Sequence, residues 1–183
     1  SRIGKFAGRI LSQPKKTLVV AGGAKISDKI EVLKQFVLTG VKSILIGGKM
    51  ANAFLLAQQQ KELIQPFHTD KLPAKLLSQK IQENEELLKE INLAEEIIEL
   101  AEINKVTLIF PEDYKVVSDY QSTIFENKIT PDFSKELQLD LGEKTINQFE
   151  DLFKDIKNVF WNGPLGAYDH PACSYYAEGS LEL

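Results

Sequence analysis

The chain has 183 residues, 43% of them hydrophobic and 26% charged, which is an ordinary composition for a soluble globular protein with one sizeable core. No run approaches the roughly 18 apolar residues of a membrane span, and the first residues lack the apolar segment of a signal peptide. The single cysteine, Cys173, excludes an internal disulfide framework, so we expect a cytoplasmic protein.

The formal net charge of −4 conceals a strong asymmetry along the chain. Residues 1–61 carry eleven basic and two acidic side chains, whereas residues 62–183 carry eleven basic and twenty-four acidic ones. A basic segment is compatible with nucleic-acid binding. However, these lysines are spread over several predicted elements with few aromatic residues between them. A small phosphorylated ligand is therefore the favoured partner, and nucleic acid the alternative.

Apolar residues at helical spacing predict a first helix over residues 1–12, ended by Pro14. Short apolar runs then alternate with amphipathic segments. The expected strands are 17–21, 43–46, 106–110, 137–141 and 159–161, and the expected helices are 28–39, 49–60, 84–104 and 143–156. Residues 61–83 show no clear pattern, and residues 111–136 look irregular, with short edge strands at 114–118 and 122–126. This alternation predicts an α/β, Rossmann-like fold with a mostly parallel sheet flanked by helices.

The helix over 84–104 has the clearest pattern. Its predicted apolar face consists of Leu87, Leu88, Ile91, Ala94, Ile97, Ile98 and Ala101. Glutamates occupy the rest of the wheel, among them Glu85, Glu86, Glu95 and Glu96. We interpret them as a solvated helix face and not as paired catalytic acids.

The stretch TLVVAGGAKISDKI, residues 17–30, is the first candidate site. An apolar strand stops at Gly22 and Gly23, and Ser27 and Asp28 suit the start of a helix. The turn from a strand into a helix N-terminus presents backbone N–H groups and a positive dipole end to an anion. Lys25 and Lys29 would add mobile positive charge to the same place. The stretch therefore predicts a phosphate site.

Four predicted strands end in glycine, at Gly22, Gly47, Gly142 and Gly163. Because ligands of parallel α/β sheets lie beyond the carboxyl ends of the strands, these glycines predict a cleft lined by main chain. Neither a Walker P-loop nor the dinucleotide fingerprint G-x-G-x-x-G is present. His170 and Cys173, spaced H-x-x-C, lack a second ligand pair, so we expect no metal site there.

Four segments occur in a specific order: GGAKISDKI, IGGKMANAFLLAQ, DLGEKTI and WNGPLGAYD. They resemble the C-terminal, nucleotide-binding domain of phosphoglycerate kinases, where the typical forms are GGAKVSDKI, IGGGMA, DIGPKT and WNGPMGVFE. The lead-in IGKFAGRILSQPKK resembles the segment that joins the interdomain helix of that family to this domain. The resemblance implies that residues 1–12 are a remnant of the interdomain helix and that residues 13–183 are the nucleotide-binding domain.

The resemblance also implies roles for individual residues. Lys25 and Lys29 would contact the nucleotide phosphates and act in catalysis. Gly22, Gly23 and Ala24 would lie along the nucleotide, Gly47 and Gly48 at the adenine pocket, and Gly142 beside the base. The phosphate and ribose side would be lined by Asn162, Pro164 and Gly166. Asp169 stands where the family has a ribose-binding glutamate, and Lys49 stands where it has a small residue.

By the same resemblance, the full-length parent would transfer a phosphoryl group between 1,3-bisphosphoglycerate with ADP and 3-phosphoglycerate with ATP, in glycolysis and with Mg²⁺. Two parts of the family pattern do not appear in this sequence: the N-terminal lobe that binds phosphoglycerate, and the GGGD[ST] segment whose aspartate holds magnesium. We therefore expect a domain incomplete at its C-terminal end, without turnover of its own and without a metal ligand. The alternative is a non-catalytic nucleotide- or phosphate-binding module.

Overall fold

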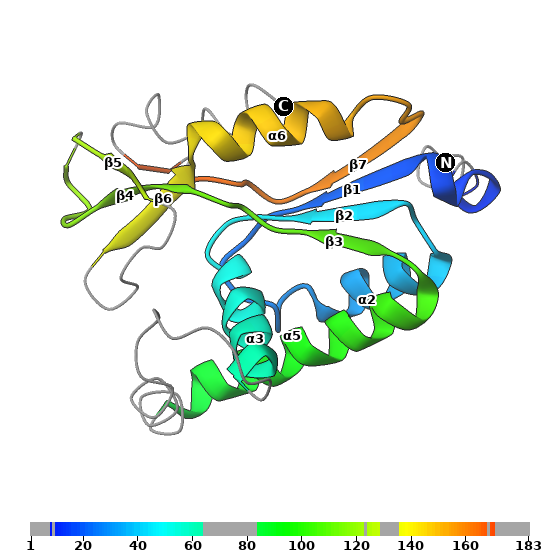
Figure 1. The fold of residues 1–183 in the computed structure, drawn as a ribbon, viewed down its shortest axis with the longest axis horizontal. Helices are drawn as coiled ribbons and strands as arrows, with labels where there is room; N and C mark the ends of the chain where they lie inside the picture. Colours follow the sequence, from blue (N-terminus) through cyan, green and yellow to red (C-terminus); the bar gives the residue numbers. More distant parts are fainter. Residues whose placement is uncertain are drawn as a thin grey trace.

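The computed structural model of the chain describes residues 8, 10–63, 84–122, 124–128, 136–167 and 169–170, and its strands form two sheets (Figure 1). The larger sheet has the strand order β3-β2-β1-β7, and each neighbouring pair is parallel. Its strands are β1 (Thr17–Ala21), β2 (Ser43–Ile46), β3 (Thr107–Ile109) and β7 (Asn158–Asn162). The inner strands β1 and β2 are buried at every residue, which explains why their sequences are mostly apolar without alternation.

Helices cover both faces of this sheet (Figure 1). One face is packed by α2 (Ile30–Thr39), α3 (Ala51–Leu63) and α5 (Glu85–Asn104), and the other by α6 (Glu143–Leu152). Successive side chains of β1 alternate between the two faces: Val19 joins the three-helix core, whereas Leu18 and Val20 join the core under α6. The predicted α/β fold with a mostly parallel sheet flanked by helices is confirmed.

A second, antiparallel sheet follows β3 in the chain and has the order β5-β4-β6. It consists of β4 (Tyr114–Val117), β5 (Glu126–Lys128) and β6 (Leu137–Leu141). The sequence predicted β4 as an edge strand, which is wrong: it is the central strand and is buried throughout. The strand expected at 122–126 is displaced to β5. The sequence analysis also placed Gly142 with Gly22, Gly47 and Gly163 at the ends of parallel strands. This is wrong for Gly142, because the strand before it, β6, pairs antiparallel with β4 and does not join the parallel sheet.

The helix boundaries follow local capping chemistry. Gly40 ends α2 in the left-handed conformation, with φ of 72°, as a helix-terminating glycine should. Asn84 starts α5, and its side chain accepts a hydrogen bond from the Leu87 N–H at 3.0 Å. α2 begins at Ile30, so Ser27 and Asp28 lie in the turn before it and not in its first turn. α6 ends at Leu152, four residues before the predicted end.

Two further sequence expectations concern the N-terminal segment and the apolar face of α5. Residues 10–12 are helical and Ile10 is buried, but most of the helix predicted over residues 1–12 lies outside the described residues. In α5, Leu88 is exposed although it was assigned to the apolar face, and Glu90 is buried in its place. A 3-10 turn, η1 (Pro14–Lys16), leads into β1.

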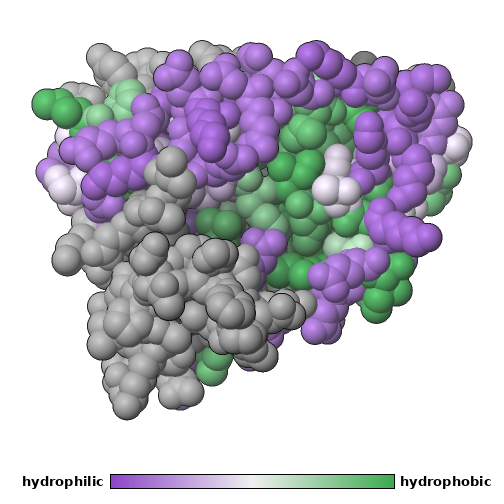
Figure 2. All heavy atoms as spheres, in the orientation of Figure 1, coloured by the Kyte–Doolittle hydropathy of each residue, from purple (hydrophilic) through white to green (hydrophobic). Residues whose placement is uncertain are grey.

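The surface beside the β3 edge is apolar. Figure 2 shows hydrophobic side chains there, between hydrophilic regions on either side of the sheet. No helix among the described residues is both long and apolar enough to cross a membrane.

Candidate functional site

The loops that follow β1, β2 and β7 touch one another at the carboxyl end of the parallel sheet. We call residues 22–24, 47–48 and 162–166 the glycine loops. The Gly22 N–H donates to the Asn162 carbonyl oxygen at 2.9 Å. A Cβ atom added at Gly22 would lie 1.9 Å from the Pro164 carbonyl oxygen, so the two main chains pass in direct contact. Only glycine fits at this crossing.

The loop after β2 closes the same corner. The Gly47 N–H donates to the Ala21 carbonyl oxygen at 2.9 Å. Gly48 has φ of 68°, and a Cβ atom added to it would lie 2.5 Å from the Gly23 carbonyl oxygen. That carbonyl also accepts the Met50 N–H at 3.0 Å. The three glycine loops are therefore in main-chain contact at this end of the sheet. The cleft that the sequence predicted at these strand ends stays a prediction.

The two predicted phosphate lysines reach different neighbours. Lys29 stands at the N-cap position of α2, is half-buried, and donates from Nζ to the Asn162 side-chain oxygen. Its Cε atom is 3.3 Å from the Cβ position of Gly23, so its side chain lies across the glycine loops. Lys25 is exposed and forms an ion pair with Glu86 in the first turn of α5. The hydrogen bond and charge of Glu86 raise the pKa of Lys25, and those of Lys25 lower the pKa of Glu86.

The loop between β1 and α2 already holds an internal anion, which the sequence analysis missed. Glu90 of α5 accepts the Ile26 N–H at 2.5 Å and the Ser27 N–H at 3.3 Å. These amides are therefore satisfied within the protein and do not point to an outside ligand. The signal for Glu90 was available: it falls four residues before Ala94 and seven before Ile97, inside the apolar stripe of α5.

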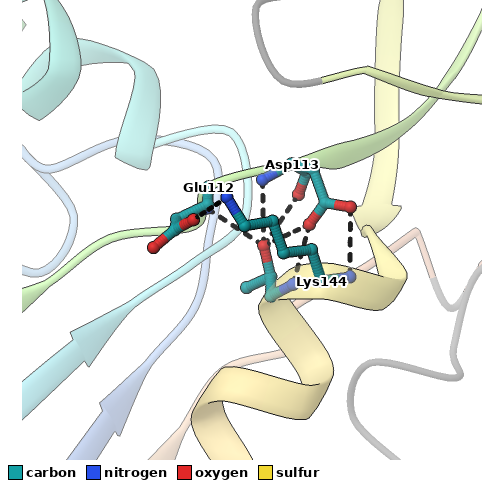
Figure 3. Close-up of polar contacts among 4 residues, drawn as sticks. Glu112, Asp113 and Lys144 are labelled. Carbon is teal, nitrogen blue, oxygen red and sulfur yellow. Dashed lines mark hydrogen bonds and ion pairs between the residues drawn. The ribbon is translucent and has the colours of Figure 1, made fainter.

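Gly142 lies at a second closed junction, the start of α6 (Figure 3). Asp113 accepts the N–H groups of Lys144 at 3.2 Å and Thr145 at 2.8 Å, so its carboxylate satisfies the helix N-terminus. The Thr145 hydroxyl in turn accepts the main-chain N–H groups of Glu112 and Asp113, both at 3.0 Å. A Cβ atom added at Gly142 would lie 2.2 Å from the Asp113 carboxylate.

The outer face of this junction carries an ion pair, Lys144 with Glu112 at 2.5 Å. The hydrogen bond from Lys144 lowers the pKa of Glu112. Asp113 and Thr145 themselves are buried. The junction is therefore a buried helix cap with an ion pair on its surface, and Asp113 is a second carboxylate whose position the sequence analysis did not predict.

The remaining predicted residues follow the glycine loops along the chain. Gly166 is partly buried, and the next residue, Ala167, donates to the Leu139 carbonyl of β6 at 2.7 Å. Asp169 is exposed in the turn after it. His170 is buried, hydrogen-bonds the Tyr120 carbonyl through Nε2 and packs edge-on against the Tyr120 ring. Asp169 therefore sits on a segment attached to the second sheet, and Cys173 lies outside the described residues.

Two hollows in the described part of the chain contain none of the predicted site residues. One, of about 160 Å³, lies between α3, α5 and β3 and is lined by Gln58, Ile98, Ala101, Glu102, Val106, Leu108 and Phe110. The other, of about 330 Å³, lies on the second sheet, beside the ion pairs of Lys128 with Glu126 and Glu136. The candidate site, by contrast, consists of main chain and lysine side chains in the glycine loops.

Comparisons with known proteins agree on one family. The phosphoglycerate kinase family profile matches residues 4–183. The phosphoglycerate kinase of Lactobacillus johnsonii is 35% identical over 181 residues, which cover 98% of this chain and 38% of that protein. The Akkermansia muciniphila enzyme of the same name is 31% identical over 183 residues, covering 96% of this chain and 40% of that protein.

A solved structure shares the fold. The fold matches the phosphoglycerate kinase structure from Coxiella burnetii with a TM-score of 0.67 and 24% identity, over 97% of this chain and 41% of that one. The chain thus spans about two fifths of the length of the relatives it matches. On these matches, the chain belongs to the phosphoglycerate kinase family.

Proposed function

We propose that this chain is the ATP- and ADP-binding, C-terminal domain of a phosphoglycerate kinase, with residues 1–12 derived from the interdomain helix. The glycine loops would carry the nucleotide, and Lys25 and Lys29 its phosphates. The full-length protein would transfer a phosphoryl group between 1,3-bisphosphoglycerate with ADP and 3-phosphoglycerate with ATP. The observation that carries the proposal is the contact among three glycine loops with the Lys29 side chain lying across them.

The chemistry of phosphoryl transfer suits such a surface. A loose transition state needs positioning and charge neutralisation more than a covalent nucleophile. Glycine allows the main chain to approach a polyphosphate closely, and lysine supplies a point charge on a flexible stem that can follow a moving phosphoryl group. Lys29, half-buried and directed by Asn162, is the better-positioned of the two cations.

The resemblance implies that Mg²⁺ accompanies the nucleotide. Within the described ranges, no group of three or more His, Cys, Asp or Glu side chains is arranged to hold a metal ion. We propose that Mg²⁺ reaches this surface with the nucleotide. From the family resemblance we further propose that Gly142 lies beside the base and that Asp169 binds the ribose.

Titration of the isotope-labelled chain with ADP, followed by NMR, tests the binding proposal. We expect amide shifts concentrated in the glycine loops. Lys29→Ala should weaken ADP binding about tenfold, since it removes one hydrogen bond to a charged group. Lys42→Ala is the matched control, because Lys42 is exposed at the opposite, amino end of β2. Equal affinities of the Lys29→Ala variant and the wild type would refute the assignment of Lys29 to the phosphates, and amide shifts outside the glycine loops would refute the proposed site.

The predicted lack of turnover is tested separately. We expect no phosphoglycerate-dependent ATP consumption by the purified chain above the rate of a sample without protein. Turnover that depends on 3-phosphoglycerate would contradict this part of the proposal and leave the nucleotide-binding part intact.

A further inference from the structure

α5 carries two carboxylates toward the loop between β1 and α2. Glu86 and Glu90 are four residues apart and so lie on the same side of the helix. Glu90 is buried and holds the amides of Ile26 and Ser27. Glu86 holds the side chain of Lys25, the residue before that pair. The same helix thus binds the main chain of the loop through Glu90 and pairs with its exposed lysine through Glu86.

The two contacts differ in how readily they can be exchanged. The bonds to Glu90 involve a buried carboxylate and a fully buried residue, Ile26, so breaking them would leave charge and amides unsatisfied. In the ion pair, the Lys25 and Glu86 side chains are 50% and 67% exposed. Exposed ion pairs contribute little net stability, so water or another anion can replace Glu86 at low cost.

We propose that Glu86 is a resident competitor for Lys25: it holds the ammonium group in the free protein and releases it when the phosphates of a nucleoside di- or triphosphate bind. Glu90 is the positioning residue that keeps the loop in place during this exchange. The inference rests on the proposed function, because it takes the incoming anion to be a nucleotide phosphate. Glu86 therefore lowers the affinity of the site for phosphates, and its removal strengthens binding.

ADP titrations of the whole 183-residue chain test the inference, with adenosine as the ligand that lacks phosphates. Glu86→Gln keeps the shape of an exposed side chain and removes its charge. We expect it to tighten ADP binding about two- to fivefold, the range of an exposed ion pair, and to leave adenosine binding unchanged. Glu99→Gln is the control: Glu99 is exposed on the same helix, about 20 Å further along. It should bind ADP like the wild type.

A double-mutant cycle identifies Lys25 as the target. In a Lys25→Ala background, Glu86→Gln should no longer tighten ADP binding. The inference is overturned if Lys25→Ala weakens ADP binding while Glu86→Gln leaves it unchanged or weakens it. If neither Lys25→Ala nor Lys29→Ala affects ADP binding, the phosphate site itself is refuted, and the inference with it.

Discussion

Two places in this fold bring a distant, buried carboxylate to main-chain amides beside a helix start, and they differ in the lysines that flank those amides. At the start of α6, Asp113 accepts hydrogen bonds from the amides of Lys144 and Thr145. The Thr145 hydroxyl in turn accepts the amide of Glu112, which precedes β4. Before α2, Glu90 binds the amides of Ile26 and Ser27, and a lysine lies on either side of that pair: Lys25, which is exposed, and Lys29, which is half-buried.

The comparison separates a structural anion site from one suited to a ligand. The α6 junction is reciprocal and buried, so an outside anion could enter only by breaking it. The loop before α2 combines a fixed main chain with two cations whose present partners, Glu86 and Asn162, are side chains. Similar local chemistry thus gives a cap in one place and a candidate binding surface in the other.

The largest expected effect comes from Gly22→Ala, which tests whether the glycine loops must touch. The added Cβ atom would meet the main chain of Pro164, and main chain cannot move aside as a flexible side chain does. We expect a loss of about 3 kcal/mol or more in the free energy of unfolding, measured by urea denaturation. Gly8→Ala, where the space is open, is the control and should be neutral or slightly stabilising. Equal stability of the two variants would contradict the packing described here.

Thr145→Val tests the α6 junction. Valine keeps the volume of threonine but leaves the amides of Glu112 and Asp113 without the hydroxyl. We expect a loss of about 2–3 kcal/mol in denaturant unfolding. Asn147→Ala, at an exposed position of the same helix, should change stability by less than about 0.5 kcal/mol. A Thr145→Val variant as stable as this control would show that the junction is not the structural site we describe.

Glu90→Gln makes the corresponding change at the other junction. The glutamine side chain still offers one acceptor oxygen, but it carries no charge and presents an N–H donor to the loop. Because the carboxylate is buried, we expect a loss of about 1–2 kcal/mol, measured by the same unfolding experiment. Unchanged stability would mean that the bonds to Ile26 and Ser27 do not hold the loop.

The smallest expected effect is a change in the pKa of a glutamate, and it distinguishes the ion pair of Glu86 from that of Glu112. Lys25 lowers the pKa of Glu86, and Lys144 lowers that of Glu112, relative to the ordinary value of 4.5. Each pair stabilises the fold fully above that value and ceases to do so as the pH falls through the lowered pKa. In NMR titrations, saturating ADP should shift the pKa of Glu86 upward and leave that of Glu112 unchanged. Equal responses of the two would contradict the exchange of Lys25.

The sequence predicted the parallel strands well because their signal is local. Apolar runs bounded by glycine at 17–21 and 43–46 match β1 and β2 residue for residue. The end of α2 was also predictable from a single residue, because Gly40 readily adopts the left-handed conformation that terminates a helix. The placement of β6 could not be read in this way, since an apolar strand before a glycine looks the same whether it pairs with parallel or antiparallel neighbours.

The contacts of the candidate site were predicted in part. The glycine loops meet because parallel strands bring their carboxyl ends to one edge, which the alternation of elements implies. The partners of the cations were not predictable from local sequence: Glu86 and Glu90 lie about sixty residues from the loop that they contact. Glu90 was nevertheless detectable as a charged residue inside an apolar stripe, which favours a buried, paired carboxylate.

A crystal structure of this chain with ADP and Mg²⁺ tests the central claim most directly. Our account predicts the phosphates against the glycine loops, within hydrogen-bonding distance of the Lys29 ammonium group, with Lys25 turned from Glu86 toward them. A nucleotide bound elsewhere, such as in the hollow between α3, α5 and β3, or one whose phosphates point away from both lysines, would contradict it.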